Sequence, residues 1–355
     1  MGLRSFIFKR TITAFIILLM AISFNFYLFI VMPGNPVELF IPSRGITKEQ
    51  YDQYVAAFKR AWGLDKPLYE QYFIYLKRMF TWEFGYSIIN KRDVADEIMY
   101  RLPWTILLMG GSAVIAIVVG VIIGVFAAYK RGSKFDISML IISLITNSLP
   151  VFWLGMVFIV IFAGALKLFP TSHAYPPNWG VLEPWPQPFT IKTVQTGLSV
   201  TTTLVVNPSD TVTWIVGHFR HLFLPLLTLS IFQFGGFVLL TRATMLESLT
   251  EDYIVTARAK GLPERSVLFR HALKNASLPI ITSVAITFGF MLSGAMITET
   301  VFTWPGLGHW IYRAVVLKDY FSMQAIFYII TLCVIVANII ADLIYGIIDP
   351  RIKYG

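Results

Sequence analysis

The sequence contains few charged residues and a single cysteine. Asp, Glu, Lys and Arg make up 14% of the 355 residues and hydrophobic residues 56%, and the mean hydropathy is +0.67. These values are far from those of a soluble globular domain and indicate a membrane protein. The lone cysteine, Cys333, excludes a disulfide within the chain.

Sequence signatures of nucleotide binding and of hydrolysis are also missing. No glycine is followed by a lysine, so the chain has no G-x-x-x-x-G-K-[ST] phosphate loop. Neither H-E-x-x-H nor G-x-S-x-G occurs. We therefore expect no catalytic residues, no enzyme activity and no ATP or other cofactor bound by this chain itself.

Long apolar runs dominate what is present. Six segments without Lys, Arg, Asp or Glu are long enough to cross a bilayer core, which takes roughly 20 residues. They are residues 11–32, 104–129, 137–166, 222–241, 276–298 and 321–341. The first exceeds the apolar region of a signal peptide, so we expect an uncleaved anchor. The sequence predicts an all-α polytopic membrane protein with six transmembrane helices.

Basic residues are unevenly distributed around these segments. About half of the 29 Lys and Arg residues lie before the first, between the second and third, between the fourth and fifth, or after the sixth. The positive-inside rule places these parts, and both termini, in the cytoplasm. The net charge of +9 therefore reflects orientation in a membrane, and nucleic acid is not an expected partner.

The predicted spans divide the chain into five parts. They are 1–32 (cytoplasmic N-terminus and first span), 33–103 (extracytoplasmic), 104–166 (second and third spans), 167–221 (extracytoplasmic insert) and 222–355 (last three spans with a cytoplasmic loop, 242–275).

Both extracytoplasmic parts are long enough to fold. In the first, Thr47 and Gln50 have capping-box spacing, which predicts the start of a short amphipathic helix. A second such helix is expected to bury one face, formed by Leu68, Tyr72, Leu76 and Phe80. Together they are expected to form a lid on the outer membrane surface. In the insert, the β-branched run FTIKTVQTGLSVTTTLVV predicts a small β-hairpin.

Three histidines of the insert are candidate metal ligands. His218 and His221 have a spacing at which two imidazoles can share a metal, and His173 lies in the same insert. No cysteine or carboxylate completes the set. We therefore expect no metal site, and we interpret the pair as an interfacial anchor at the mouth of the fourth span.

The apolar segments carry small and hydroxyl-bearing residues instead of central ionisable ones, so an ion relay is not indicated. The GVIIG run at 120–124 is expected to allow close helix packing. Asp342 is expected to pair with Arg242. In the third and fifth spans, close packing and a wet translocation path stay open as alternatives. The path candidates are Asn147, Ser148, Thr282, Thr287 and Ser293.

A polar, basic loop interrupts the apolar pattern at 242–275. Residues 246–260 and 264–275 have the composition of two helices, separated by Gly261-Leu262-Pro263. Glycine accepts the left-handed conformation that ends a helix, and proline suits the start of the next one. The sequence predicts an elbow that projects into the cytoplasm and docks another protein.

The stretch TARAKGLPERSVLFRHALKNASLP resembles the cytoplasmic EAA loop of ABC-importer permeases of the oligopeptide, dipeptide and nickel branch. Where that motif has Glu-Ala-Ala before its glycine, this chain has Val255, Thr256 and Ala257 before Gly261, so the glutamate is absent. The later proline of the motif is also absent, at 271–274. Further segments similar to this branch are MPGNP (32–36), WEFGYS (82–87), FPTS (169–172), HLFLPLLTL (221–229), ETVFTWPGLG (299–308) and DLIYGIIDPRIKYG (342–355).

The resemblance implies a permease subunit of a prokaryotic plasma membrane. Its implied partners are a second, homologous permease, two cytoplasmic ATPase subunits that bind ATP and Mg²⁺, and an extracytoplasmic substrate-binding protein. The ATPases would be coupled through residues 252–275. The implied coupling residues are Thr256, Ala257, Arg258, Lys260, Gly261 and Arg265, with Ala257 and Gly261 close to the ATPase groove.

Alternatives remain at two levels. The basic residues of the loop either pair with acidic residues of an ATPase or lie beside anionic lipid head groups. The substrates implied by the resemblance are di- or oligopeptides, with oligosaccharides and nickel as alternatives. An exporter of the same architecture is opposed by the resemblance alone, whereas an ion-coupled secondary transporter also lacks the intramembrane charges that it would need.

Overall fold

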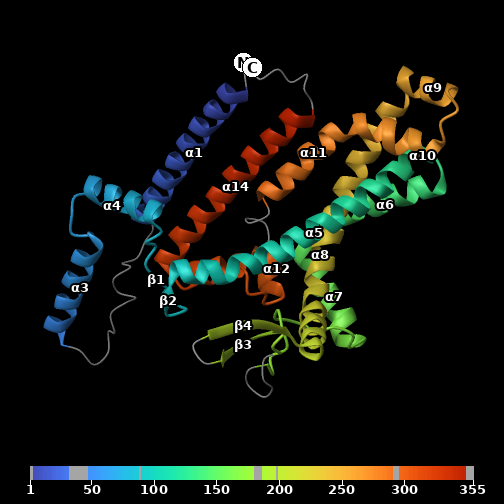
Figure 1. The fold of residues 1–355 in the computed structure, drawn as a ribbon. Coiled ribbons are helices and arrows are strands. Elements are labelled where there is room, and N and C mark those ends of the chain that lie inside the picture. Colours follow the sequence, from blue (N-terminus) through green and yellow to red (C-terminus); the bar gives the residue numbers. More distant parts are fainter. Residues whose placement is uncertain are drawn as a thin grey trace.

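The computed structural model describes residues 3–31, 47–87, 89–179, 186–196, 199–290 and 296–348, which are mostly helical. Two long helices, α5 (Val94–Tyr129) and α8 (Pro208–Leu249), pack against each other over much of their length (Figure 1). A second group consists of α1 (Leu3–Val31) and α14 (Tyr320–Ile348), which lie side by side. Helix α11 (Leu273–Phe290) contacts α8 and α14 and so joins the two groups.

Four described helices contain a stretch long and apolar enough to cross a membrane. These stretches are Phe8–Leu28, Val94–Tyr129, Pro208–Leu249 and Tyr320–Ile340, and a bent pair of helices supplies a fifth if it is counted as one span. The chain is therefore a polytopic membrane protein. The expected fifth span, 276–298, includes residues 291–295, which lie outside the described residues.

The expected third span, 137–166, is not one continuous helix. Helix α6 (Lys134–Ser148) is followed by α7 (Val151–Phe158), which continues into a π-helical segment, η1 (Ile159–Ala165), and the two parts are bent by 101°. Leu149 between them is extended, at φ −77° and ψ 135°. The cause is Pro150, because a proline disfavours helical conformation at the residue before it.

Helices α5 and α8 extend beyond the expected spans. Helix α5 begins at Val94, where the Asp93 side chain accepts a hydrogen bond from the Ala95 backbone N–H. Helix α8 runs for 42 residues, so the expected limits at 222 and 241 fall inside it. Hydropathy marks only the part of a helix that is in hydrocarbon, whereas the backbone pattern continues wherever the residues tolerate it.

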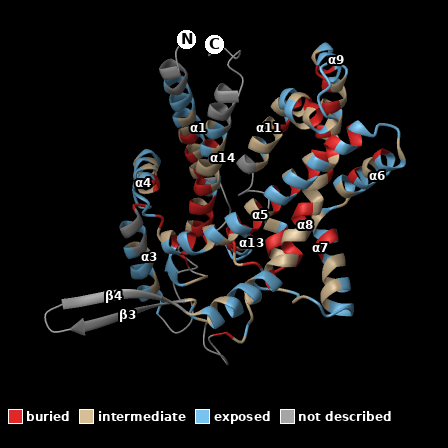
Figure 2. Cartoon of the chain, turned by 45° about the vertical axis from the view of Figure 1, so that its right-hand side comes forward, coloured by how far each residue is buried: buried red, intermediate tan, exposed pale blue. Residues whose placement is uncertain are grey.

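The expected close packing of GVIIG is confirmed. A Cβ at Gly120 would overlap the side chain of Phe237, and one at Gly124 would overlap Thr241, both on α8. Buried residues accordingly follow the α5–α8 contact, with a second group between α1 and α14 (Figure 2).

The two short helices between α1 and α5 agree with the sequence only in part. Helix α3 (Lys48–Trp62) begins with the predicted capping box, in which Thr47 and Gln50 each accept a hydrogen bond from the backbone N–H of the other. Helix α4 (Leu68–Thr81) packs against α1, and its buried face is rotated from the predicted one, of which Tyr72 and Leu76 are half-buried. Leu68 and Phe80 are exposed, whereas Tyr75 and Met79 are buried.

Contact with α1 explains that rotation. The Tyr75 hydroxyl accepts a hydrogen bond from Asn25 Nδ2 at 2.9 Å, and the Tyr72 hydroxyl lies 2.7 Å from Ser23 Oγ. These polar partners on α1 fix which side of α4 faces inward, and hydrophobic periodicity alone does not contain that information.

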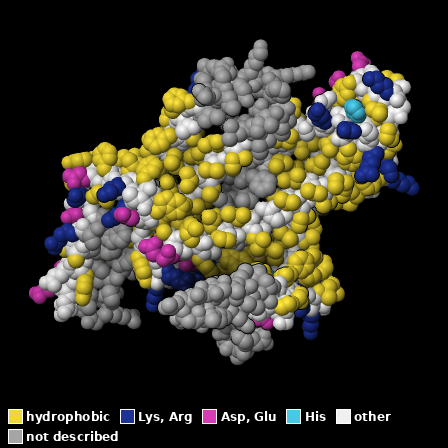
Figure 3. All heavy atoms as spheres, viewed as in Figure 1, with side chains coloured by type: hydrophobic (Ala, Val, Ile, Leu, Met, Phe, Trp, Pro, Cys, Tyr) yellow, Lys and Arg dark blue, Asp and Glu magenta, His cyan; other side chains and the backbone are white. Residues whose placement is uncertain are grey.

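Short elements complete the described chain. Strand β1 (Tyr86–Ser87) pairs antiparallel with β2 (Arg92–Asp93), and β3 (Phe189–Thr196) pairs antiparallel with β4 (Ser199–Val206). The remaining elements are α9 (Asp252–Ala259), α10 (Glu264–Ser266), π-helical η2 (Val267–Ala272), α12 (Met296–Val301) and α13 (Leu307–Val316). Hydrophobic side chains cover the middle of the visible face, and charged ones gather at its ends (Figure 3).

Candidate functional site

The predicted elbow is present, with shifted helix limits. Helix α8 ends at Leu249, so the expected helix over 246–260 is broken before α9 begins. The expected second helix, 264–275, consists of α10, η2 and the start of α11, and it continues into the apolar part of α11 without a break. In Figure 1 the elbow projects at the end of α8, beyond the body of the molecule.

Gly261 forms the corner as expected. Its φ is +72°, in the left-handed region, and its N–H donates to the Arg258 carbonyl at 2.9 Å. An added Cβ would have no heavy atom within 4 Å outside its immediate neighbours. The corner therefore leaves free space next to Gly261 for a partner to approach.

The underside of the elbow is packed onto the ends of α5 and α8. Ile254, Val267 and Ala272 are fully buried in one apolar cluster with Val125 of α5 and Met245 of α8. A displacement of the elbow must therefore move the ends of both helices.

Five of the six predicted coupling residues are exposed: Thr256, Arg258, Lys260, Gly261 and Arg265. Ala257 is the exception, because it is only 5% exposed and belongs to the apolar cluster. Its side chain packs the elbow against this chain, and the expected approach of its backbone to the ATPase groove stays a prediction.

Arg258 has a partner within the elbow. Its Nη2 lies 2.7 Å from Glu264 Oε1, and the pair closes the corner across Gly261. The Glu264 carboxylate raises the pKa of the Arg258 guanidinium above its usual value. Both side chains are partly exposed, so we expect the pair to contribute about 0–1 kcal/mol.

The path candidates lie on different helices. Asn147 and Ser148 are exposed at the end of α6, which packs against α8. Thr282 and Thr287 are half-buried on α11, and their hydroxyls donate to the carbonyls one turn earlier, of Leu278 and Ser283, at 2.9 Å each. Ser293 lies outside the described residues.

Arg242 pairs with Asp136, whereas the side chain of Asp342, its expected partner, lies outside those that the structure describes. Arg242 binds Asp136 through two hydrogen bonds, Nε to Oδ1 at 2.5 Å and Nη2 to Oδ2 at 2.9 Å. Asp136 also accepts from the Gly132 N–H at 2.9 Å. Because both partners are partly or fully buried, this contact ties the start of α6 to α8. Sequence spacing gave no reason to choose between Asp136 and Asp342.

The insert histidines bind backbone groups. Nδ1 of His221 lies 2.9 Å from the Ser172 carbonyl oxygen, and Nδ1 of His218 lies 2.8 Å from that of Trp214. The His218 ring stacks on Trp104 with centroids 5.8 Å apart. The described residues contain no group of three or more His, Cys, Asp or Glu that could hold a metal.

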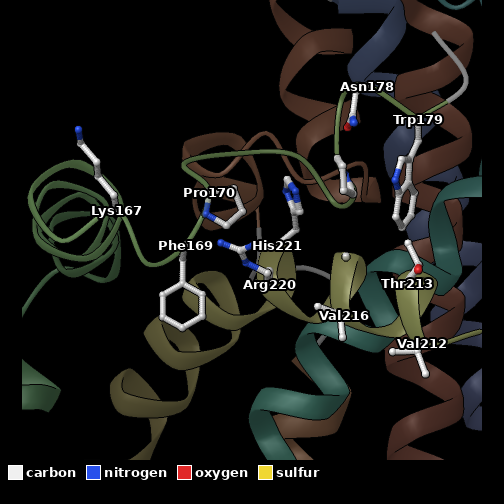
Figure 4. A pocket seen from close by; sticks show the side chains of 12 residues that line it. Lys167, Phe169, Pro170, Asn178, Trp179, Val212, Thr213, Val216, Arg220 and His221 are labelled. Carbon is white, nitrogen blue, oxygen red and sulfur yellow. The ribbon is translucent and has the colours of Figure 1, made fainter. Parts of the chain in front are cut away.

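A pocket of about 630 Å³ opens beside these histidines. Figure 4 shows Arg220 and His221 at its centre, with Phe169 and Pro170 on one side and Trp179 on the other. Arg220 Nη2 donates to the Leu168 carbonyl at 3.3 Å, which holds the guanidinium against the loop.

A buried carboxylate was not recognised from the sequence. Glu299 on α12 is fully buried; its Oε1 accepts from the Thr105 hydroxyl at 2.8 Å and its Oε2 from the His309 N–H at 2.9 Å. A Cβ at Gly306 would overlap this carboxylate. The sequence signal for this buried carboxylate was the ETVFTWPGLG segment, in which two glycines, Gly306 and Gly308, follow Glu299 and leave room for its side chain.

Asp319 forms a second buried centre. Its Oδ2 accepts from the hydroxyls of Ser87, at 2.7 Å, and Ser322, at 2.8 Å. Ser87 belongs to β1 and Ser322 to α14, so this carboxylate holds the WEFGYS segment against the start of the last helix.

Long apolar helices with a basic elbow projecting at one end are typical of the membrane component of a transport system. The chain belongs to the family described as binding-protein-dependent transport system inner membrane component, which matches residues 120–354. Residues 3–109 match the N-terminal part of such membrane components.

Several transport permeases are similar to this chain over nearly its whole length. The chain is 35% identical to the di/tripeptide transport system permease protein DppB of Pseudomonas aeruginosa over 330 residues, 93% of each chain. It is 34% identical to the dipeptide transport system permease protein DppB of Escherichia coli, covering 91% of each. The oligopeptide transport system permease protein AppB of Bacillus subtilis is 33% identical, covering 99% of each.

Proposed function

We propose that this protein is the permease subunit of an ATP-driven importer and forms part of the path for di- or oligopeptides across the plasma membrane. The observation that carries the proposal is the exposed elbow at Gly261, packed onto α5 and α8 and continuous with α11, in a chain of this transport family. The names of these relatives support peptides as the substrate class over oligosaccharides or nickel. The protein itself is not an enzyme.

The finer arrangement belongs to the same proposal. The chain has six spans with both termini in the cytoplasm, and β3 and β4 form an extracytoplasmic hairpin. The start of α1 and the elbow lie at the same end of the molecule, opposite β3 and β4, which supports this orientation (Figure 1). Two ATPases, which bind ATP and Mg²⁺, a second permease and an extracytoplasmic binding protein complete the system. Asn147, Ser148, Thr282 and Thr287 remain candidates for the path.

A pair of glycines tests the coupling site. Gly261 and Gly132 are both left-handed, at φ +72° and +77°, and a Cβ at either meets no heavy atom within 4 Å. Leucine at either position therefore costs the same backbone strain, about 1–2 kcal/mol. We expect Gly261→Leu to weaken ATPase binding at least about tenfold, which corresponds to about 1.4 kcal/mol, and to abolish uptake, because the side chain fills the space left for the partner.

The measurement is co-purification of the ATPases and ATP-dependent uptake of a labelled dipeptide by vesicles that contain the complete system. Gly132→Leu is the control and should retain both activities. Equal ATPase binding by the two variants would exclude the elbow as the coupling site. Uptake of nickel or an oligosaccharide, with no uptake of peptide, would correct the substrate class alone.

A further inference from the structure

A second pocket, of about 430 Å³, lies between α9 and the start of α11, in the elbow. Apart from Leu262, its lining is polar: Tyr253, Ser266, Arg270, His271, Lys274 and Asn275. These side chains supply guanidinium, ammonium, imidazole, amide and hydroxyl donors. None of the lining residues carries a carboxylate, so the pocket has the composition of an anion site.

The helix geometry brings the two cations together. Arg270 and Lys274 are four residues apart on the continuous helical stretch from η2 into α11, so they share one face. Residues 267–272 form a π turn, a feature frequent at functional sites. Two like charges so placed repel each other unless an anion lies between them.

One acid of the elbow, Glu264, is already engaged. It binds Arg258 at 2.7 Å, across the corner. In the described part of the chain, neither Arg270 nor Lys274 forms an ion pair within 4.0 Å. Figure 3 shows Lys and Arg side chains around one histidine at this end of the molecule, with Asp and Glu side chains nearby. Because neither cation of the pocket is paired with one of these acids, a bound anion would supply the negative charge.

The wall of the pocket is fixed before any ligand binds. The Tyr253 hydroxyl lies 2.5 Å from Ser248 Oγ, and Ser248 Oγ donates to the Ala272 carbonyl at 3.0 Å. These bonds join α9 and η2 to the end of α8. A preformed site loses little conformational entropy when it binds.

We propose that this pocket binds a phosphate group. A phosphate has several acceptor oxygens, and arginine and lysine are the side chains that bind it most commonly. Two sources share this chemistry: the head group of an anionic phospholipid and a soluble phosphate. Lys274 and Asn275 directly precede the apolar part of α11, which places the pocket at head-group depth and favours the lipid. The assignment of this lipid to the inner leaflet is the one step that rests on the proposed orientation of the chain.

The test uses the purified full-length chain and two variants that lose the same charge. Arg270→Gln/Lys274→Gln removes both cations of the pocket, whereas Lys130→Gln/Arg131→Gln removes two from another basic turn that does not line it. One arm counts phosphatidylglycerol retained after delipidation against phosphatidylcholine, by native mass spectrometry. The other measures the shift in Tm with inorganic phosphate against chloride of equal ionic strength.

We expect the pocket variant to retain at least about fivefold less phosphatidylglycerol than the control, or to lose the phosphate-dependent shift if the ligand is soluble. Lys274→Arg keeps the charge and should behave as wild type, which separates loss of the site from loss of the fold. If the pocket variant and the control respond alike in both arms, the proposal is wrong. Neither arm depends on ATPase docking or uptake, so the result is independent of the proposed function.

Discussion

Glu299 lies where three segments of the chain meet. Its carboxylate joins α12, Thr105 of α5 and the start of α13, and Thr105 Oγ1 in turn accepts from the Leu307 N–H at 2.8 Å. Burial raises the pKa of Glu299 to about 7 from its usual 4.5, although backbone hydrogen bonds oppose the rise. At a pH between these two values, Glu299 is mostly protonated where an exposed glutamate is mostly ionised.

This carboxyl makes stability depend on pH. The folded state binds its proton more tightly than the unfolded state, so the contribution is complete below pH 4.5 and is lost as the pH rises toward about 7. We expect Glu299→Gln, which mimics the protonated form, to flatten this fall in a series of Tm measurements between about pH 5 and about pH 7.5.

Comparison with wild type isolates the carboxyl from its neighbour. Burial lowers the pKa of His309, which acts in the opposite direction and is present in both proteins. Identical slopes of Tm against pH in wild type and Glu299→Gln would contradict the assignment.

Two helical glycines give a matched pair at the α5–α8 contact. A Cβ at Gly124 would overlap Thr241 and the Val238 carbonyl, whereas one at Gly236 meets no heavy atom within 4 Å. We expect Gly124→Ala to destabilise the protein by about 1–3 kcal/mol through overpacking. Gly236→Ala should be neutral or stabilising by up to about 1 kcal/mol, because alanine favours a helix. Thermal unfolding in detergent measures both, and equal effects would refute close packing at Gly124.

At the scale of elements, α4 depends on its contact with α1. Met79 is 2% exposed and belongs to an apolar cluster that includes Leu18 and Ile22 of α1, whereas Leu68 on the same helix is 59% exposed. We expect Met79→Ala to cost about 2–5 kcal/mol and to detach α4 from α1, while Leu68→Ala costs less than about 1 kcal/mol. Protease sensitivity of the 62–68 link reports detachment. A greater loss of stability in Leu68→Ala than in Met79→Ala would instead support the face predicted from periodicity.

The helices and turns could be predicted from the sequence better than the contacts between them. The capping box at Thr47 and the left-handed turn at Gly261 followed from local chemistry, so both were predictable. The bend at Pro150 had its signal in the sequence but was outweighed by the continuous hydropathy of 137–166. The partners of Arg242 and Tyr75 could not be predicted, because they lie on helices distant in sequence. The burial of the Ala257 side chain could not be predicted for the same reason, because it depends on α5 and α8.

At the scale of the whole molecule, the proposed orientation assigns each exposed turn to one side. In a Cys333→Ala background, single cysteines at Thr81 and Ser209 should react with an impermeant thiol reagent added to intact cells. Cysteines at Lys134 and Thr256 should react only after permeabilisation. All four positions are exposed in the structure, so a lack of reaction reports membrane sidedness rather than burial.

The outcome distinguishes orientation from family membership. Reaction of Thr256→Cys from outside would overturn the cytoplasmic elbow and, with it, docking of the ATPases there. Failure of Ser209→Cys alone would revise only the insert.

Helix α8 has a mechanical consequence. Its 42 residues correspond to about 63 Å at 1.5 Å per residue, roughly twice the hydrocarbon thickness of a bilayer. Arg220 and His221 line the pocket of about 630 Å³ roughly a third of the way along the helix, and Met245 and Ser248 lie near its other end, under the elbow. The helix can therefore act as a lever: a tilt of about 5° about its middle moves each end by about 3 Å in opposite directions. Pro225, within the helix, is where such a lever would flex.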